Sequence, residues 1–226
     1  MVELNTDRRE ITAKVVYYGA AMSGKTTNLR ALRHMAPPGT KGRLLSLETH
    51  DDRTLFFDLL PMRFHIDKNT ALKLRIFTVP GQPFHRSTRK IVLRQADAIV
   101  FVADSQLQQT EANKDAFNDL RENIEANQLP ADIPLVVQFN KQDLPNVRSS
   151  SDIDAFGHRV ATPTLPAIAI DGSGVRETLE AIIGSLWSRL SVEPDVIAHF
   201  GRFGPQTMAH FFDGWHQPTK NIGANG

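Results

Sequence analysis

The stretch at residues 19–26 most constrains what this chain can fold into. It reads Gly-Ala-Ala-Met-Ser-Gly-Lys-Thr and matches the pattern G-x-x-x-x-G-K-[ST] without exception. An apolar run, Lys14–Tyr18, comes before it, and a stretch that suits a helix, Lys25–Met35, comes after it. Glycines in such a loop let backbone N–H groups curl around phosphate oxygens, and the following helix N-terminus adds partial positive charge. The motif therefore predicts a strand, a phosphate-binding loop and a helix in succession.

The order of the apolar runs predicts an α/β fold. Runs rich in β-branched and aliphatic residues predict buried strands at Lys14–Tyr18, Leu72–Val79, Ala98–Ala103, Leu135–Asn140 and Leu165–Ile170, with a weaker candidate at Arg43–Leu47. Helices are expected at Lys25–Met35, Arg86–Gln95, Thr110–Gln128 and Val175–Leu190. Strands and helices that alternate in this way form crossover units. We therefore expect a mostly parallel central sheet with helices on both faces.

Composition excludes several classes of protein. The length of 226 residues suits one sizeable α/β domain, and a net charge of +1 gives no reason to expect nucleic acid as a partner. Cysteine is absent, which excludes disulfides and thiolate zinc sites. No apolar run approaches the roughly 18 residues of a membrane span, and the first ten residues lack the apolar core of a signal peptide. We therefore expect a cytoplasmic protein without an integral membrane segment.

The chain divides by composition near residue 190. Residues 1–190 are expected to form one domain, and residues 191–226 a C-terminal appendage rich in Gly, Pro, His and aromatic residues. In the appendage, Met208, Phe211, Phe212 and Trp215 have the spacing i, i+3, i+4 and i+7, which predicts a short amphipathic helix from about Pro205. Its apolar face could pack on its own domain or dock a partner, and the residues alone leave both possibilities open.

The phosphate loop predicts specific ligands for a nucleoside triphosphate and its metal. We expect Lys25 to reach the β- and γ-phosphates and the Thr26 hydroxyl to bind Mg²⁺. The remaining nucleotide contacts in this region are expected from backbone and small side chains, at Gly19, Ala20, Ala21, Ser23, Gly24 and Thr27. The loop therefore predicts a nucleotide site, without saying which base it accepts.

A second motif points to guanine. Asn140, Lys141, Gln142 and Asp143 follow directly on the apolar run Leu135–Phe139. A carboxylate at Asp143 can accept hydrogen bonds from both guanine N1 and the 2-amino group. Adenine lacks this donor pair and would leave the carboxylate unpaired, which disfavours it. We therefore expect GTP or GDP, with Asn140, Lys141 and Asp143 on the base side of the site.

Together these motifs resemble one known family. The chain resembles bacterial Ras-like small GTPases of the mutual gliding-motility protein A (MglA) type over about residues 8 to 190. The segments that carry the resemblance are KVVYYGAAMSGKTTNLR, KGRLLSLETHDDRTLFFDLLP, FTVPGQPF, IVFVADSQ, QFNKQDLPN and AIAIDGSGV. The resemblance implies a P-loop small-GTPase fold that binds GTP or GDP with Mg²⁺.

The resemblance also implies roles for residues outside the two motifs. Thr54 would contact Mg²⁺ and the γ-phosphate, and Arg53 beside it resembles an arginine finger that the protein itself supplies. In the second switch, the Gly81 N–H would sense the γ-phosphate and Gln82 would orient the attacking water. Ala169 resembles the small residue whose backbone N–H touches the guanine O6. On this basis Lys25, Arg53 and Gln82 are the expected catalytic residues, and Thr26 and Thr54 the expected metal ligands.

Two residues depart from the usual small-GTPase pattern. Thr78 stands where most small GTPases have an aspartate that binds Mg²⁺ through water, although threonine is usual in this bacterial branch. The metal then lacks one carboxylate, for which Asp58 or a nearby acid could compensate through water. Ala21 stands where glycine is usual, and its methyl group crowds the space that Gln82 and an arginine finger share. We expect slow intrinsic hydrolysis biased toward the GTP-bound form.

Two features next to the motifs concern the surroundings of the site. The residues Arg86, Arg89, Lys90 and Arg94 form a basic stripe after the second switch. Such a stripe is usually a solvated face, and the alternative is that it helps a partner to read the nucleotide state. Asp104, at the end of a predicted strand, could support the site indirectly without being catalytic.

The leading functional hypothesis is a GTP-dependent molecular switch that hydrolyses GTP slowly. The resemblance implies a small roadblock-type activating protein as partner, effectors of cell polarity or of gliding or twitching motility, and recruitment to a cell pole through partners. The alternative is a nucleotide-gated interaction module with negligible hydrolysis, which Thr78 and Ala21 favour, whereas Arg53 and Gln82 favour turnover. An ATP-dependent kinase fits poorly, because nothing replaces the guanine motif as an adenine site.

Overall fold

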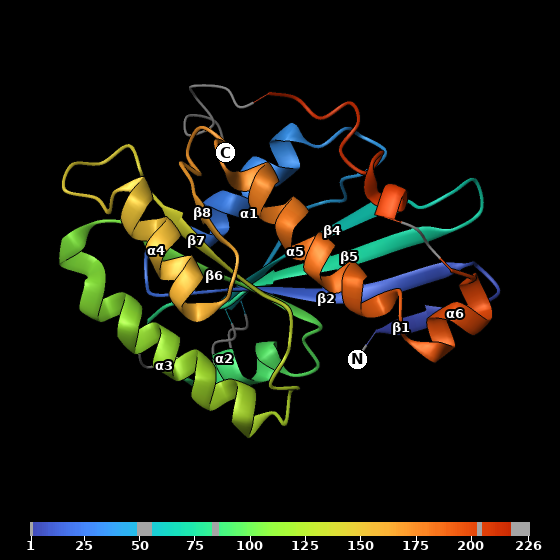
Figure 1. Ribbon diagram of the computed structural model, residues 1–226, viewed down its shortest axis with the longest axis horizontal. Coiled ribbons are helices and arrows are strands. Elements are labelled where there is room, and N and C mark those ends of the chain that lie inside the picture. The colour runs from blue at the N-terminus through green and yellow to red at the C-terminus, as the bar shows by residue number, and fades with distance from the viewer. Residues whose placement is uncertain (1, 49–55, 83–85, 203–204, 218–226) are drawn as a thin grey trace.

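The fold is built around one mixed sheet. The computed structural model describes residues 2–48, 56–82, 86–202 and 205–217. Within these ranges, eight strands form a sheet in the order β3-β4-β5-β2-β6-β7-β8, with β1 paired to β2 outside this path (Figure 1). The strands are β1 Glu3–Asn5, β2 Glu10–Tyr18, β3 Leu45–Glu48, β4 Phe56–His65, β5 Ala71–Thr78, β6 Ala98–Asp104, β7 Leu135–Asn140 and β8 Thr164–Pro166.

Parallel pairing dominates the sheet. β2 pairs in parallel with both β5 and β6, and the parallel order continues through β7 to β8. β1, β3 and β4 pair antiparallel with their neighbours. The predicted mostly parallel α/β fold is thus confirmed. Because the carboxyl ends of β2, β6 and β7 meet at one edge, the loops that follow them lie side by side.

Helices cover both faces of the sheet (Figure 1). In β2, Ile11, Ala13 and Val15 belong to one buried cluster, whereas Val16 and Tyr18 belong to the other, because successive side chains of a strand point to opposite faces. The first cluster also holds side chains of α1 Lys25–Met35, α5 Val175–Leu190 and α6 Pro194–Phe200. The second holds side chains of α2 Arg86–Leu93, α3 Thr110–Ala126 and α4 Ser150–Val160.

Most predicted elements are present, with changes at their ends. α1 and α5 have the predicted bounds. α2 and α3 end two residues earlier than predicted, and Gln95 and Gln128 beyond them have positive φ angles of 58° and 54°, which a helix cannot continue through. β8 stops at Pro166, because the chain then turns through an isolated bridge between Ile168 and Ser173.

Elements that the sequence analysis did not predict are β1, β4, α4 and α6. β4 is long, at ten residues, and pairs with both β3 and β5. Leu60, Met62 and Phe64 alternate along it as buried residues, although Pro61 lies in its middle, where a ladder N–H is lost. α4 begins with a capping box, in which the Ser149 side chain accepts from the Asp152 backbone N–H and the Asp152 side chain accepts in return.

The C-terminal segment packs on the side of the sheet that α1, α5 and α6 cover. A 3-10 helix, η3 Pro205–Met208, is followed by turns. The predicted short amphipathic helix is therefore only one 3-10 turn long, and the aromatic residues of the pattern lie beyond it. Three buried aromatic side chains of this segment gather around Phe64 of β4 and Trp187 of α5, with ring centroids 5.2 to 6.5 Å apart. We call these five residues the tail cluster; its members are Phe64, Trp187, Phe211, Phe212 and Trp215. The division at residue 190 remains a prediction.

Candidate nucleotide-binding site

The candidate site lies at the carboxyl edge of the parallel strands. The phosphate loop follows β2, Asp104 ends β6, and Asn140–Asp143 follows β7. Ala169 lies in the loop between β8 and α5. Chain segments that are up to 150 residues apart therefore converge on one edge, as ligand sites of open α/β sheets do.

Two glycines shape the phosphate loop. Gly19 has φ of 144°, and a Cβ built on it would lie 2.2 Å from the backbone oxygen of Val102. Gly24 has φ of 102°, and its Cβ would lie 2.1 Å from the Asn140 Nδ2 atom. Both positions therefore exclude a side chain, the first by packing against β6 and the second by its contact with the guanine motif.

The start of α1 is suited to an anion. Gly24 is the N-cap, no side chain caps the helix, and its first turn, which includes Thr26 and Thr27, has no acidic residue. The Ser23 Oγ atom is buried within the loop and has no hydrogen-bond partner among the described residues. Unpaired donors at a positively polarised helix end fit the phosphates of a nucleotide. Ala20 is buried, whereas Ala21 is exposed at the tip of the loop.

Lys25 is a buried cation in contact with the loop. Its Nζ atom donates to the Gly19 and Ala20 backbone oxygens at 3.0 and 2.6 Å. Burial, and to a lesser extent the positive charge of Arg89, lower the pKa of Lys25 from 10.5 to about 7. A lysine held in this state gains its full charge when an anion binds beside it, which suits the role expected for the phosphate-loop lysine.

A buried carboxylate lies next to Thr26. Asp58 of β4 is 2% exposed and accepts a hydrogen bond from the Thr26 Oγ1 atom at 2.6 Å. It also accepts from Ser46 Oγ at 2.6 Å and from Thr78 Oγ1 at 3.1 Å. In return, the Asp58 backbone N–H donates to Thr78 Oγ1 at 2.9 Å. Thr78 of β5 thus provides no carboxylate, but the neighbouring strand β4 provides the carboxylate of Asp58 at hydrogen-bond distance.

This donor set fits Mg²⁺, which prefers carboxylate, hydroxyl and water oxygens. No group of three or more His, Asp or Glu side chains suited to a metal occurs in the part of the chain that the structure describes. The fit therefore rests on one carboxylate and the hydroxyls around it. Thr54, the other expected metal ligand, and Arg53, the expected arginine finger, lie outside the described residues.

The base side of the site is tied to the phosphate loop by Asn140. Its Nδ2 atom donates to the Ser23 backbone oxygen at 2.8 Å, and its Oδ1 atom accepts from the Ala169 backbone N–H at 2.9 Å. One buried side chain thus joins the loops expected at the phosphates and at the guanine O6. Ala169 is itself buried.

The other two residues of the guanine motif differ in exposure. Asp143 is exposed, as a carboxylate available to a ligand must be. Lys141 has a positive φ of 68°, and its Nζ atom forms an ion pair with Asp104 Oδ2 at 2.6 Å. The indirect support expected from Asp104 therefore takes the form of a contact that holds Lys141.

The second switch lies against the phosphate loop. A Cβ built on Gly81 would lie 2.4 Å from the Ala21 backbone N, so only glycine fits at this close approach. Gln82 follows with an exposed side chain, and its backbone oxygen accepts a hydrogen bond from Arg89 Nη1 at 2.7 Å. The structure thus brings Gly81, Gln82 and the phosphate loop together.

The interpretation of the basic stripe as a solvated face is wrong for Arg89. The Arg89 side chain is 7% exposed and forms an ion pair with Asp119 of α3 at 2.7 Å. Arg86 also pairs with Asp119, at 3.2 Å, but its side chain is 67% exposed. Helical spacing alone could not separate the two, because the partner carboxylate lies on another helix.

A second buried polar network was not predicted. Asn28 of α1 and Gln138 of β7 exchange two hydrogen bonds, at 2.8 and 2.9 Å, and Gln138 also donates to Thr178 of α5 at 2.9 Å. All three side chains are buried. The sequence signal was a polar residue inside each apolar segment, and a polar residue can be buried only with a partner.

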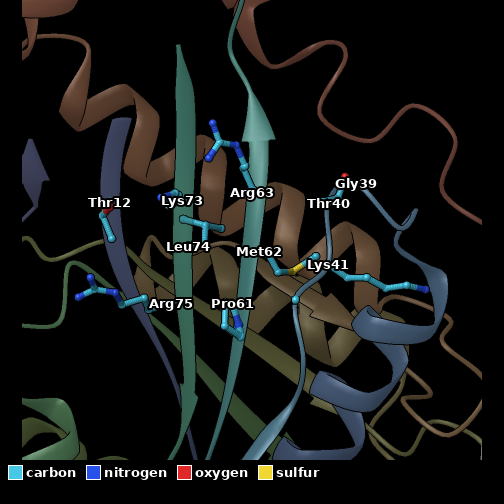
Figure 2. Close-up of a pocket in the computed structure, with 11 residues that line it drawn as sticks. Thr12, Gly39, Thr40, Lys41, Pro61, Met62, Arg63, Lys73, Leu74 and Arg75 are labelled. Carbon is cyan, nitrogen blue, oxygen red and sulfur yellow. The ribbon is translucent and has the colours of Figure 1, made fainter. Parts of the chain in front are cut away.

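The structure also has a cavity of about 440 Å³ far from the phosphate loop. It lies over β2, β5 and β4, beside the loop that holds Thr40 and Lys41 (Figure 2). Of the cations that line it, Arg63 and Lys73 form ion pairs with Glu10 at 2.6 Å. Because none of the residues that line it belongs to the phosphate loop or to a helix N-terminus, the cavity lacks the features of the phosphate site.

Comparisons with known proteins agree with this geometry. Residues 61–183 match the model of the ADP-ribosylation factor (Arf) family. The chain is also 42% identical over 181 residues to "Mutual gliding-motility protein MglA" of Myxococcus xanthus (strain DK1622), covering 79% of this chain and 92% of that protein. This chain belongs to the MglA-type Ras-like small GTPases. The family binds guanine nucleotides, which agrees with the loop, the guanine motif and their connection through Asn140.

Membership in this family confirms the resemblance that the sequence motifs indicate. The Asp58 carboxylate, which accepts hydrogen bonds from Thr26 and Thr78, lies beside the position where the usual switch aspartate is absent. Among the described residues, no helix is both long and apolar enough to cross a bilayer.

Proposed function

We propose that this small GTPase is a molecular switch that binds GTP with Mg²⁺ and hydrolyses it slowly to GDP and phosphate. The observation that carries the proposal is the pair of hydrogen bonds of Asn140, because they fix the phosphate loop and the guanine side in one rigid unit. A site built in this way selects the base and the phosphates together.

The residues of the phosphate loop would divide the work as follows. Backbone groups from Gly19 to Thr27 would surround the phosphates, and Lys25 would neutralise charge that develops on the transferred phosphoryl group. Asn140 would orient the loops, whereas Lys141, Asp143 and the Ala169 N–H would face the guanine. This division is supported by the contacts of Lys25 and Asn140 described above.

The switch residues would complete the catalytic arrangement. Gln82 would position the attacking water and Gly81 would contact the γ-phosphate. From the first switch, Arg53 would offset developing negative charge and Thr54 would complete the metal ligands. Bound Mg²⁺ would supply electrostatic stabilisation of the phosphate oxygens. Thr26 would hold it, and Asp58 would orient its hydration while keeping the Thr26 hydroxyl in place.

A second function, a nucleotide-gated module with negligible turnover, is favoured by one contact. Gly81 lies directly against the Ala21 backbone, which is where the extra methyl group of Ala21 is attached. If this crowding excludes Gln82 from the reacting water, GTP would persist until a partner acts. A roadblock-type activating protein is the partner we propose for that case.

The biological role that we propose follows the similar protein from M. xanthus, whose name describes gliding motility. In this proposal, the GTP-bound form would engage effectors of cell polarity or surface motility, with recruitment from the cytoplasm to a cell pole. The similarity to that protein supports this part of the proposal.

Single-turnover hydrolysis of Mg²⁺-GTP by the purified full-length chain tests the proposal. We expect slow turnover, and a loss of at least about tenfold in both Arg53→Ala and Gln82→Ala. Ala21→Gly should raise the rate if its methyl group crowds the site. GTP that binds but persists unchanged in all variants would support the gated module. Equal affinity for ATP and GTP would contradict the guanine assignment.

A further inference from the structure

The contacts of Arg89 suggest a role beyond the general function proposed above. Arg89 lies on α2, three residues after Arg86, and its guanidinium uses all three nitrogens. Nε and Nη2 donate to the two oxygens of Asp119 at 2.7 and 3.1 Å, and Nη1 donates to the Gln82 backbone oxygen at 2.7 Å. A planar guanidinium held in a bidentate pair has one fixed orientation. The third hydrogen bond therefore fixes the backbone at Gln82.

Asp119 is itself held in place by several donors. Besides Arg89, it accepts hydrogen bonds from the Tyr18 hydroxyl, from Asn123 Nδ2 at 3.2 Å and from Arg86 Nε at 3.2 Å. Burial alone would raise the pKa of Asp119, but the hydrogen bonds from Arg89 and Tyr18 outweigh burial and lower it. The carboxylate is therefore ionised at neutral pH and serves as a fixed anchor.

The anchor also connects to the phosphate loop. Tyr18 is the last residue of β2 and directly precedes Gly19, while Asn123 of α3 donates to the Tyr18 hydroxyl at 3.0 Å. Gln82 is thus linked to the start of the phosphate loop through Arg89, Asp119 and Tyr18. On its other side, Gly81 contacts Ala21. The backbone at 81–82 is held between these two contacts.

We propose that Arg89 is a positioning residue, which places Gln82 for hydrolysis through the Asp119 anchor. This inference rests on the proposed role of Gln82. Arg89 does not reach the reacting atoms itself in this account. It restricts the Gln82 backbone, so that the side chain samples fewer positions and spends more time near the phosphate site. Loss of Arg89 also removes a positive charge that acts on Lys25, so it should slow hydrolysis much more than it changes nucleotide affinity.

A double-mutant cycle measures whether Arg89 acts through Gln82. Arg89→Met should lower the single-turnover rate by about tenfold in the full-length protein, but by less than about twofold when Gln82→Ala is also present. Affinities for GDP and GTP should stay within about threefold of the unmutated protein. An equal loss in both backgrounds, or no loss at all, would overturn the inference. Arg89→Lys and Asp119→Asn provide milder changes if Arg89→Met does not fold.

Arg86→Ala is the matched control. It removes a neighbouring arginine that donates one hydrogen bond to Asp119 and has no hydrogen bond to Gln82 in the described structure, so the rate should fall far less than in Arg89→Met. A loss as large as that of Arg89→Met would assign the effect to general charge.

Amide exchange decides the inference even if Gln82 proves not to be catalytic. In the GDP-loaded protein, or the nucleotide-free protein if GDP does not bind, the amides of Val79, Gly81 and Gln82 should exchange about tenfold faster in Arg89→Met. Their exchange should change far less in Arg86→Ala. Unchanged exchange in Arg89→Met would show that the contact does not hold the backbone. A failure of Gln82→Ala to slow hydrolysis would instead contradict the proposed catalytic role, so the two failures are distinguishable.

Discussion

At the residue scale, Asp58 has the sharpest consequence. It is the one carboxylate within hydrogen-bond distance of Thr26 in the described structure, and it accepts from three hydroxyls. Asp58→Asn keeps the shape but removes the charge, so Mg²⁺-dependent retention of nucleotide should weaken. We expect GDP release at millimolar Mg²⁺ to accelerate by about tenfold or more, because loss of a group that orients a metal ligand commonly weakens metal binding to this extent.

The control for this prediction is Ser46→Ala. It removes one donor to Asp58 and leaves the carboxylate in place, so it should change GDP release far less. The measurement is the release of a fluorescent GDP analogue over a range of Mg²⁺ concentrations. If Asp58→Asn shows the same Mg²⁺ dependence as the unmutated protein, Asp58 has no part in metal binding.

Lys25 makes stability depend on pH in the nucleotide-free protein. Its pKa is about 7 when folded, against an ordinary value of 10.5, so between these pH values the unfolded chain binds the additional proton. The free energy of unfolding should therefore rise with pH across this window, by at most about 1.4 kcal/mol per pH unit from this residue. Urea unfolding at pH 7, 8 and 9 measures the slope, and Lys25→Met should reduce it. An unchanged slope in Lys25→Met would contradict the assignment.

At the element scale, three segments are joined by the network of Asn28, Gln138 and Thr178. Gln138→Leu would leave the buried Asn28 Oδ1 atom without a donor, although Asn28 Nδ2 still donates to the Gly24 oxygen, at a cost of about 1–3 kcal/mol. The double variant Asn28→Leu with Gln138→Leu should recover part of this loss, because neither polar group is then stranded. Urea unfolding of the three variants and the unmutated protein measures both effects. Additive losses would show that the two amides are not coupled.

Local sequence patterns predict some of the elements and not others. The strand–loop–helix unit at residues 14–35 and the guanine motif were predictable because each depends on local spacing. β4 was missed although Leu60, Met62 and Phe64 alternate, since Pro61 argues against a strand. α4 was missed although Ser149 and Asp152 form a capping box, a signal that can be read from sequence.

Other parts of the site depend on partners distant in the chain. The role of Asp58 follows from the pairing of β4 with β5, which brings Thr78 beside it. The burial of Arg89 follows from the position of Asp119 on α3. No local pattern contains either fact. Arg53 and Thr54 lie outside the described residues, so their predicted roles remain predictions.

At the scale of the whole molecule, the tail cluster makes the C-terminal segment part of the core. Phe211, Phe212 and Trp215 are 4 to 9% exposed. The His216 backbone N–H also donates to the Met35 oxygen, at the end of α1. Trp215→Ala should therefore lower the free energy of unfolding by about 3–5 kcal/mol. Thermal or urea unfolding measures this, and His210→Ala, an exposed change in the same segment, is the control.

Truncation after residue 190 tests the predicted division of the chain. It would remove three members of the tail cluster and expose Phe64 and Trp187. We expect the truncated protein to retain guanine-nucleotide binding, because none of the loops at the site is removed, but to melt at lower temperature and aggregate more readily. A truncated protein as stable and soluble as the full chain would show that the tail contacts contribute little.

The tail cluster also determines what intrinsic fluorescence can report. The chain has two tryptophans, Trp187 and Trp215, and both belong to the cluster rather than to the nucleotide site. Their fluorescence emission should therefore change when the C-terminal segment detaches from the domain. GTP binding by itself should change the emission little, because neither indole lies at the nucleotide site. Tryptophan fluorescence is thus an intrinsic probe of the packing of the C-terminal segment.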